Sequence, residues 1–577
     1  MIDNFQENAN FLWQVAKDIL RGVFKEYEYV DVILPFVVLR RLDCVLEDCK
    51  DAVIETLKKH HDETLPDMTG ILLQATKTKK SPNGLKFYNA SFYDLRRLAQ
   101  DTQNIESNFW NYITGYSSNV REIIDNFGLQ RIVEKLVKND YLFQLIGKFT
   151  EVDFHPDKVS NHQMGYVFEE LLRRFSEMSN ETAGEHYTPR EVIRLMVNLL
   201  FAEHKDDLEG KGIIRSVFDP ACGTGGMLTI AKEHIQDQIN PHVEVVMYGQ
   251  ELNEQTYAIA KSDVLIKGEE ADNIRLGSSF SEDRFQGQKF DFMLSNPPFG
   301  VSWKKEQGFI ENESNNPHGR FPVGLPRISD GALLFLQHMI SKMEPKGSRI
   351  AIIFSGSPLF TGDAGRGESN IRKWIIENDW LEAIVAMPTE LFYNTGIATY
   401  IWLITNKKPP RRKGKVQLIN AVDFYSKAQK RLGKKRNFIT DEQIREITRI
   451  YGSFTEDRNC KIFDNTDFGY TKITVERPEI KNGKVVKDKQ GRPKPDLELR
   501  DFEKIPLEQD IDEYFQRDVL PHAPDAWMDR TKDKIGFEIS FTKQFFQHRR
   551  LRPLDQIKAE ILALEKETEG ILRKIMD

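Results

Sequence analysis

Short apolar runs alternate with amphipathic helical patterns between residues 161 and 406, and this alternation constrains the fold more than any other feature of the chain. Seven runs have the length and composition of strands, at residues 213–218, 243–249, 273–276, 290–295, 349–355, 381–386 and 399–405. Strands separated by helices predict an open, doubly wound, mostly parallel α/β sheet. Ligands of such sheets bind beyond the carboxyl ends of the strands, so we expect functional residues directly after the strands.

The chain before and after this region has a different character, so we predict three domains in its 577 residues. Residues 1–160 show apolar residues at helix spacing and no strand-like alternation, which predicts an N-terminal helical domain. Residues 161–406 form the expected α/β domain. Residues 407–577 begin with a basic segment, continue with polar sequence punctuated by Pro, and end in a helix expected over residues 554–575.

The charge of the chain limits how it can hold a polyanion. The net charge is −7, whereas a protein that grips DNA alone usually carries a basic face. Positive charge is concentrated in residues 407–436, which contain twelve Lys and Arg residues and one acid, Asp423. Two interpretations stay open for this stretch: a solvated linker or hairpin, and a patch that faces phosphates.

Neither a membrane segment nor a metal site is expected. The longest apolar run, Val32 to Leu39, is too short to span a bilayer and contains Pro35. The N-terminus lacks the layout of a signal peptide, so we expect a cytoplasmic protein. Four cysteines give no disulfide framework, and no set of His and Cys residues has metal-ligand spacing.

A glycine-rich turn, Asp219-Pro220-Ala221-Cys222-Gly223-Thr224-Gly225-Gly226, follows the first predicted strand. Glycines let a backbone turn tightly and approach a ligand closely, and the helix that follows offers free N–H groups at its start. The turn lacks the Lys-Ser/Thr ending of a P-loop, which disfavours a nucleoside triphosphate. A purely structural tight turn is the alternative interpretation of this motif taken alone.

Two further features are compatible with a nucleoside-containing ligand. The second predicted strand ends in Glu251, and a carboxylate there can accept hydrogen bonds from both hydroxyls of a ribose, although a solvated surface Glu is the alternative. Residues 184–191 predict a helix start, with Thr188 as N-cap, Pro189 as the first helical residue and Glu191 completing a capping box. Either this pattern marks only a helix start, or the positive end of the helix faces a carboxylate of the ligand.

The fourth predicted strand runs directly into Asn296-Pro297-Pro298-Phe299. The two prolines fix the backbone and remove two N–H donors, so that carbonyl groups can face a ligand. The side-chain oxygen of Asn296 and the carbonyl of Pro297 can together accept both hydrogens of an exocyclic amine, and Phe299 can stack on a base. The motif therefore predicts a site for the amino group of a nucleobase, with a Pro-rich structural loop as the alternative.

Several motifs resemble those of the modification subunits of type I restriction-modification systems, a family of N6-adenine DNA methyltransferases. Residues 219–226 resemble the SAM-binding motif of amino-methyltransferases, and residues 296–299 resemble their catalytic motif in the form common for adenine N6. The other similar segments are residues 11–43, 184–190, 320–324 and 391–396. The resemblance covers residues 10–406. It implies a Rossmann-like, SAM-dependent methyltransferase fold with residues 161–406 as the catalytic domain.

The resemblance also implies roles for the matched residues. Asn296 and Pro297 would hold the target amine, and Phe299 would stack on the base. SAM would be bound by Glu185, His186, Tyr187, Thr188, Pro189, Arg190, Asp219, Gly223, Thr224, Gly225, Gly226 and Glu251. The adenine ring of SAM would lie near Asp272 or near the turn Gly277-Ser278, two options between which the sequence does not choose.

In the resembled family a separate specificity subunit reads the DNA, two modification subunits flank it, and a restriction subunit joins for cleavage. The end of this chain is compatible with such an assembly. Ile557, Ile561, Leu564, Thr568, Ile571 and Ile575 follow the spacing of a coiled-coil seam with one polar break. This helix either contacts another subunit or packs onto its own chain.

The sequence therefore predicts methyl transfer from SAM to the N6 amine of a flipped-out adenine in a specific DNA sequence. One alternative is a stand-alone DNA adenine or cytosine-N4 methyltransferase that carries its own recognition region in residues 407–577. A second is a protein glutamine methyltransferase, whose related motif ends in Tyr and whose chains are much shorter. A third is a non-catalytic DNA-binding scaffold.

Overall fold

The structure is a computed structural model, and it describes residues 3–60, 67–179, 188–202, 208, 210, 212–393, 395–432, 434–546 and 553–564. The chain divides into two compact units, Met1–Ile539 and Ser540–Asp577. Across the described residues, no helix combines the length and the apolar character that a membrane crossing requires.

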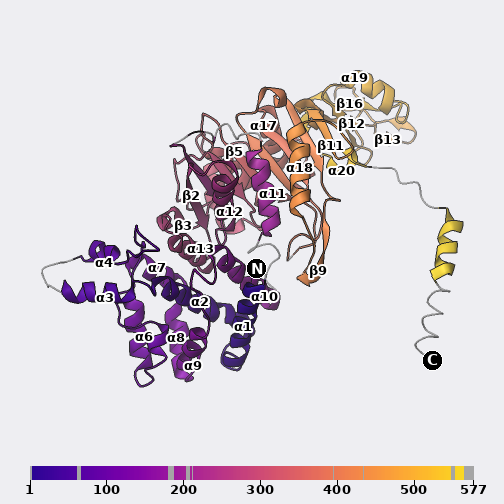
Figure 1. Ribbon diagram of the computed structural model, residues 1–577. Coiled ribbons are helices and arrows are strands. Elements are labelled where there is room, and N and C mark those ends of the chain that lie inside the picture. Colours follow the sequence, from indigo (N-terminus) through magenta and orange to yellow (C-terminus); the bar gives the residue numbers. More distant parts are fainter. Residues whose placement is uncertain are drawn as a thin grey trace. The chain divides into compact units, whose positions relative to one another are not determined.

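The N-terminal region is helical, as the sequence predicts (Figure 1). Its helices are α1 (Asp3–Ile19), α2 (Tyr29–Leu46), α3 (Lys50–Lys59), α4 (Thr69–Ala75), α5 (Leu95–Leu98), α6 (Ile105–Thr114), α7 (Ser118–Asn126), α8 (Leu129–Lys138), α9 (Leu142–Thr150) and α10 (Asn161–Ser179). Helix α2 is apolar around most of its circumference and nearly all of it is buried, so it forms the centre of this region.

Three buried polar residues of α2 position the segments around it. The Arg40 guanidinium donates to the carbonyl of Val152 at 2.7 Å, and Arg41 donates to the carbonyl of Val159 at 2.8 Å. Asp43 accepts hydrogen bonds from buried partners on two other segments, and burial raises its pKa to about 6. Buried polar groups of this kind stabilise a fold only while their partners are present.

A nine-stranded sheet follows, with the strand order β11-β8-β6-β7-β5-β4-β1-β2-β3. The strands are β1 (Ile214–Asp219), β2 (Glu244–Glu251), β3 (Ile274–Leu276), β4 (Phe292–Ser295), β5 (Arg349–Ser355), β6 (Leu381–Ala386), β7 (Thr399–Thr405), β8 (Lys415–Asn420) and β11 (Cys460–Asp464). Only β7, paired with β5 and β6, and β11, paired with β8, are antiparallel. All seven predicted strands are present, and the predicted mostly parallel sheet is confirmed.

Helices cover both faces of the sheet. Helices α11 (Arg190–Phe201), α12 (Gly226–His234), α13 (Glu254–Ile266) and α18 (Asp441–Ser453) belong to one layer, in which α11 packs against α12 and α18. The remaining helices are α14 (Gln307–Ser314), α15 (Ala332–Ser341), α16 (Ser357–Phe360) and α17 (Gly367–Glu377). Helix α13 also packs against α2 and α7, so it joins the N-terminal helices to the sheet.

The sheet continues beyond residue 406, where the sequence places the end of the α/β domain. Strand β8 pairs in parallel with β6. Strand β11, which follows helix α18 in the sequence, pairs antiparallel with β8. The basic residues that flank β8 conceal it in the sequence, because its apolar core is only Val416 to Ile419. Before α18, β9 (Ser426–Leu432) and β10 (Lys435–Phe438) form a hairpin.

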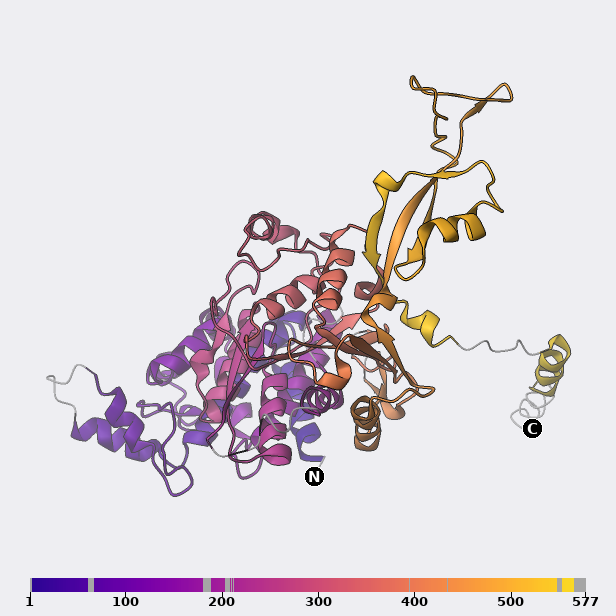
Figure 2. The same cartoon turned by 90° about the horizontal axis from the view of Figure 1, so that it is seen from above.

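A second, smaller sheet that the sequence analysis does not predict lies at the end of the first unit (Figure 2). Its central strand β12 (Gly469–Glu476) pairs with β15 (Asp501–Pro506), β16 (Trp527–Met528) and β17 (Lys534–Phe537). Its core consists of Ile473, Val475, Ile505, Phe515 and Val519.

In the second unit, α20 (Phe541–Gln544) is followed by a helix over residues 554–564. Of the expected seam positions on this helix, Ile557 is half-buried, and Ile561 and Leu564 are exposed. The remaining expected seam positions, Thr568, Ile571 and Ile575, lie outside the described residues. The coiled-coil contact stays a prediction.

The substitution Asp43→Ala tests the polar centre of the helical region. Its carboxylate accepts hydrogen bonds from the backbone N of Leu95 at 2.8 Å and from the hydroxyls of Tyr112 and Tyr116 at 2.9 and 3.1 Å. Because these donors lose a buried acceptor, we expect the free energy of unfolding to fall by about 3 kcal/mol. Urea unfolding followed by circular dichroism measures it. The exposed control Asp125→Ala should change it by less than about 0.5 kcal/mol, and equal losses in both variants would contradict the role of Asp43.

Candidate active site

Asp219, the last residue of β1, joins the two predicted motifs. Its buried carboxylate accepts hydrogen bonds from the backbone N of Ala221 at 3.0 Å and from the Ser295 hydroxyl at 2.9 Å. Ser295 ends β4 and directly precedes Asn296. Burial raises the pKa of Asp219 to about 7, although both hydrogen bonds act in the opposite direction. This carboxyl group therefore holds the glycine-rich turn against the Asn-Pro-Pro-Phe motif from within the protein.

The glycine-rich turn is also fixed to the tip of β2. The backbone N of Cys222 donates to the carbonyl of Gln250 at 3.0 Å, and the backbone N of Gly223 donates to the Glu251 carboxylate at 2.9 Å. Gly223 and Gly225 have φ angles of +55° and +80°, which residues other than glycine rarely adopt. The turn leads into α12, whose first N–H groups have no side-chain cap.

Glu251 therefore lies where the sequence places it, at the carboxyl end of β2 beside the turn. Its second carboxylate oxygen accepts hydrogen bonds from the backbone N atoms of Leu252 and Asn253 at 2.9 and 2.8 Å. These bonds fix the carboxylate at the edge of the sheet, next to the start of α12.

The Asn296 side chain has one paired end and one unpaired end. Its Nδ2 donates to the hydroxyl of Thr188 at 2.9 Å, whereas its Oδ1 is buried and has no hydrogen-bond partner among the described residues. A buried oxygen without a donor costs about 1–3 kcal/mol, so a ligand that supplies a donor gains a favourable contact here. Pro297 is buried beside it. The rings of Phe299 and Phe392 pack edge to face, with their centroids 6.2 Å apart. Phe392 belongs to the segment 391–396, whose Asn394 lies outside the described residues.

The segment before α11 differs from the prediction. Pro189, not Thr188, is the N-cap, and the helix has no side-chain cap because its neighbours are engaged elsewhere. Thr188 accepts the hydrogen bond from Asn296, and Glu191 forms an ion pair with the buried Lys435. The predicted capping box is therefore wrong. Glu185, His186 and Tyr187, three of the expected SAM-binding residues, lie outside the described residues.

Arg190 is held by α10. Its guanidinium lies 3.1 Å from the Glu169 carboxylate and stacks over the Tyr166 ring at 3.8 Å. Arg190, Thr224 and Gly226 line one pocket together with residues of α10 and α13. The structure thus brings these three expected cofactor-binding residues together, but the charge of Arg190 is already balanced by an acid that the sequence analysis does not identify.

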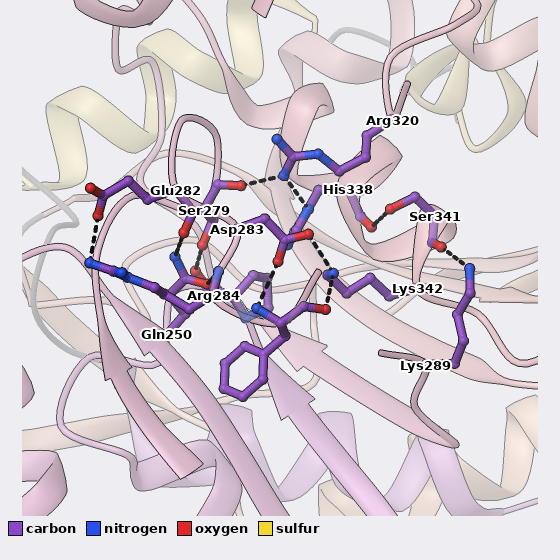
Figure 3. A network of polar contacts seen from close by, with 12 residues as sticks. Gln250, Ser279, Glu282, Asp283, Arg284, Lys289, Arg320, His338, Ser341 and Lys342 are labelled. Atoms are coloured by element: carbon purple, nitrogen blue, oxygen red, sulfur yellow. Dashed lines mark hydrogen bonds and ion pairs between the residues drawn. The ribbon is translucent and has the colours of Figure 1, made fainter. Parts of the chain in front are cut away.

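The loop after β3 is held beside Glu251 by Gln250, a buried residue that the sequence analysis misses (Figure 3). Gln250 Nε2 donates to the carbonyls of Gly277 and Glu282 at 3.1 and 2.9 Å, and its Oε1 accepts from the backbone N of Arg284 at 3.2 Å. The signal that could have identified it is its place at the tip of β2, directly before Glu251.

Two places are expected for the adenine ring of SAM. Of these, the turn Gly277-Ser278 lies beside Glu251, one of the expected cofactor-binding residues. The backbone N of Gly277 donates to the carbonyl of Glu251 at 2.9 Å. Asp272, by contrast, keeps 88% of its side chain exposed and lies 3.5 Å from Lys261.

Arg320 supports the same loop from the opposite side (Figure 3). Its guanidinium donates to the carbonyl of Ser279 at 2.6 Å, forms an ion pair with Glu313 at 2.6 Å and lies 2.8 Å from His338 Nδ1. The Ser279 hydroxyl donates to the carbonyl of Pro220 in the glycine-rich turn. Burial, followed by the charges of Arg320 and Lys342, holds the pKa of His338 well below its ordinary value, so His338 is neutral and accepts from Arg320. The motif at residues 320–324 thus stabilises the site indirectly.

Three cations of the basic stretch at residues 407–436 are buried and paired within the fold. Lys408 pairs with Asp379 at 2.6 Å, and the buried Arg412 lies 3.7 Å from the buried Glu382. Lys435 pairs with Glu191. These cations balance acids inside the fold, and the end of the stretch forms the β9–β10 hairpin, so the hairpin interpretation is confirmed there. The patch that faces phosphates stays a prediction. The described residues contain no group of three or more His, Cys, Asp or Glu side chains that could hold a metal ion.

Comparisons with known proteins identify the family of the chain. A family model described as N-6 DNA Methylase matches residues 159–489, and one described as HsdM N-terminal domain matches residues 8–149. The chain therefore belongs to the N-6 DNA methylase family. Within that family it is a modification subunit of a type I restriction-modification system, as the following relatives indicate.

The MjaIX type I restriction enzyme methylase subunit of Methanocaldococcus jannaschii is 29% identical over 510 residues, which cover 84% of each chain. The HindI methylase subunit of Haemophilus influenzae is 31% identical over 305 residues, which cover 51% of this chain and 63% of that one. The crystal structure of a type I methyltransferase subunit from Streptococcus thermophilus has the same fold, with a TM-score of 0.59 at 21% identity, over 80% of this chain and 97% of that one.

The contact between Thr188 and Asn296 generates a test of the site. In Thr188→Val the Asn296 amide loses its acceptor, so its side chain is free to rotate, and we expect methyl transfer to DNA to slow about tenfold, equivalent to about 1.4 kcal/mol. Thr188→Ser keeps the hydroxyl and should stay within about twofold of the unsubstituted protein. Single-turnover transfer of labelled methyl groups in the assembled complex is the measurement. Equal rates for the Val and Ser variants would show that the hydroxyl does not position Asn296.

Proposed function

We propose that Asn296 and Pro297 hold the N6 amine of a flipped-out adenine while a methyl group is transferred to it from SAM. The observation that carries this proposal is the buried Asn296 Oδ1 without a partner, an acceptor held in place by Thr188. An exocyclic amine supplies the donor that this oxygen lacks. Membership of the N-6 DNA methylase family supports adenine N6 as that amine.

SAM is the methyl donor that we propose, and the residues present fit it. The positive φ angles at Gly223 and Gly225 favour glycine, which has no side chain and so leaves room for a ligand at the turn. The uncapped start of α12 offers N–H donors to a carboxylate. Glu251 at the tip of β2 suits the ribose hydroxyls. The other proposed cofactor-binding residues are Glu185, His186, Tyr187, Thr188, Pro189, Arg190, Asp219, Thr224 and Gly226. When bound, SAM supplies an electrophilic methyl group.

The chemistry of the amine explains why an acceptor is needed. The N6 lone pair of adenine is delocalised into the ring and is a poor nucleophile. Hydrogen bonds from N6 to Asn296 Oδ1 and to the Pro297 carbonyl pull the amine toward tetrahedral geometry and free the lone pair. They also stabilise the positive charge that grows on N6 during attack. Phe299 stacks on the extruded base, which cannot be reached inside the duplex.

We further propose that the chain acts in the cytoplasm with DNA, a specificity subunit that reads the sequence, and a restriction subunit, with two modification subunits in each complex. The names of its relatives as subunits of type I restriction enzymes support this assembly. Incubation of the purified chain with labelled SAM and plasmid DNA, with and without its co-purifying partners, tests it. We expect methyl-adenine only with the partners, and robust site-specific methylation by the lone chain would contradict the proposal.

Asn296→Ala tests the catalytic role. The substitution removes one acceptor for N6, so we expect the rate of methyl transfer to fall by roughly 10²–10³. The affinity for SAM, measured by isothermal titration, should not change. A folded variant that keeps most of its rate would refute the role of Asn296.

Gly225→Val tests the cofactor site and should lower the affinity for SAM itself. Its φ of +80° disfavours any β-branched residue, so the turn and the start of α12 are distorted. We expect SAM binding to become too weak to detect by isothermal titration, while the circular dichroism spectrum is kept. As a matched control, Gly452→Ala changes a helical glycine with open space around it and should leave the affinity for SAM unchanged. Unchanged affinity in Gly225→Val would place the cofactor elsewhere.

A further inference from the structure

Between β12 and β15 the chain leaves the small sheet as an arm, residues 477–496 (Figure 2). At its base Pro478 lies opposite Pro495, and the backbone N of Glu479 donates to the carbonyl of Lys494 at 2.9 Å. From residue 480 to residue 494 every side chain is exposed, apart from two that are half-buried. The arm therefore contributes almost nothing to a hydrophobic core.

The arm nevertheless has a defined structure that ends in two turns. In the first, β13 (Ile480–Lys481) pairs with β14 (Lys484–Val485) around Asn482 and Gly483, whose φ angles are +50° and +71°. Two central residues with positive φ are typical of a tight hairpin turn. In the second, residues 488–492 turn back through a hydrogen bond of 2.8 Å from the backbone N of Asp488 to the carbonyl of Arg492. Residues that favour tight turns at these positions indicate that the arm is a folded projection and not a flexible linker.

Positive charge is concentrated on this arm. Residues 478–495 contain six basic and two acidic residues, whereas residues 501–537 contain five basic and ten acidic residues. The two acids of residues 478–495 pair with cations of the same segment: Glu479 with Lys481 and Lys494, and Asp488 with Arg492. The other basic residues of this segment, Lys484, Lys487 and Lys489, are exposed and have no ion-pair partner among the described residues. They give the arm a net positive charge in a chain whose net charge is −7.

We propose that this arm binds the phosphate backbone of duplex DNA, next to the sequence that the specificity subunit reads; the proposal rests on the proposed function. Three exposed lysines without partners suit phosphates, since lysine is a compact and flexible point charge. Lys484 and Lys487 are three residues apart on an extended segment and so point to opposite faces, toward phosphates on either side of a groove. The major groove admits a two-stranded ribbon. No aromatic residue lies on the arm, so stacking on single-stranded bases does not contribute.

The test uses the complex of this chain with its co-purifying subunits and the triple variant K484Q/K487Q/K489Q. Affinity for a labelled duplex is measured by fluorescence anisotropy at several salt concentrations, with and without the recognition sequence. Each lost phosphate contact lowers the slope of log K against log[salt] by about 0.9, so we expect a decrease of about one to three. Affinity should fall by the same factor on both duplexes, because phosphate contacts carry no sequence information.

A matched control is K58Q/K59Q/K79Q, which removes the same charge from exposed positions of the N-terminal helical region and should keep the slope. A second variant replaces residues 480–493 by Asn-Gly, which closes the base between Glu479 and Lys494 with a two-residue hairpin turn. It should reproduce the loss seen in the triple variant.

Three outcomes would overturn the proposal. The first is a slope in the triple variant equal to that of the control. The second is an unchanged slope with loss of a subunit from the complex in mass photometry, which would make the arm a protein contact. The third is a loss of affinity confined to the recognition sequence. Anisotropy does not depend on methyl transfer, so a complex that binds DNA but transfers no methyl group would contradict the proposed function and leave this test valid.

Discussion

The hydrogen bond between the Ser295 hydroxyl and the buried Asp219 carboxylate is the contact on which the site depends. β1 and β4 are parallel neighbours, so their carboxyl ends meet at one edge of the sheet. The bond fixes the glycine-rich turn after β1 relative to Asn296 after β4. Transfer between a bound cofactor and a bound base requires such fixed geometry, because small displacements of the reacting groups are costly in rate. This purpose accounts for a buried carboxyl group at the end of β1, directly after the apolar residues Val217 and Phe218.

The loops around that edge depend on a second layer of polar residues. The side chain of Gln250 donates a hydrogen bond to the loop after β3, and Arg320 donates to two other backbone carbonyls of the same loop. Removal of either side chain would take these donors away from the carbonyl groups of the loop. The first turn of α11 and the segment after β6 are joined in the same way, since Lys435 contacts both Glu191 and the carbonyl of Leu391.

Cations in this chain serve two separate purposes. Arg349 and Arg412 lie within 2.8 and 3.7 Å of the buried Glu382, where loss of one partner would leave an uncompensated charge and cost about 3–5 kcal/mol. The unpaired lysines of the arm, Lys484, Lys487 and Lys489, lie in solvent, where a charge costs nothing to keep and remains available to a phosphate. Sequence density of Lys and Arg does not distinguish these two uses, because it carries no information on burial.

The sequence alone determined the sheet and the two motifs. Alternation of apolar runs located all seven predicted strands, and each motif had to follow a strand because ligands bind at strand ends. The sequence did not reveal β8, whose basic flanks conceal a short apolar core, or the small sheet around β12. Tertiary structure alone decided that Thr188 holds Asn296 and does not cap α11, and that Glu191 binds Lys435. Both pairs join residues more than 100 positions apart, and such contacts are set by packing of the whole chain, whereas local patterns report only on neighbours in sequence.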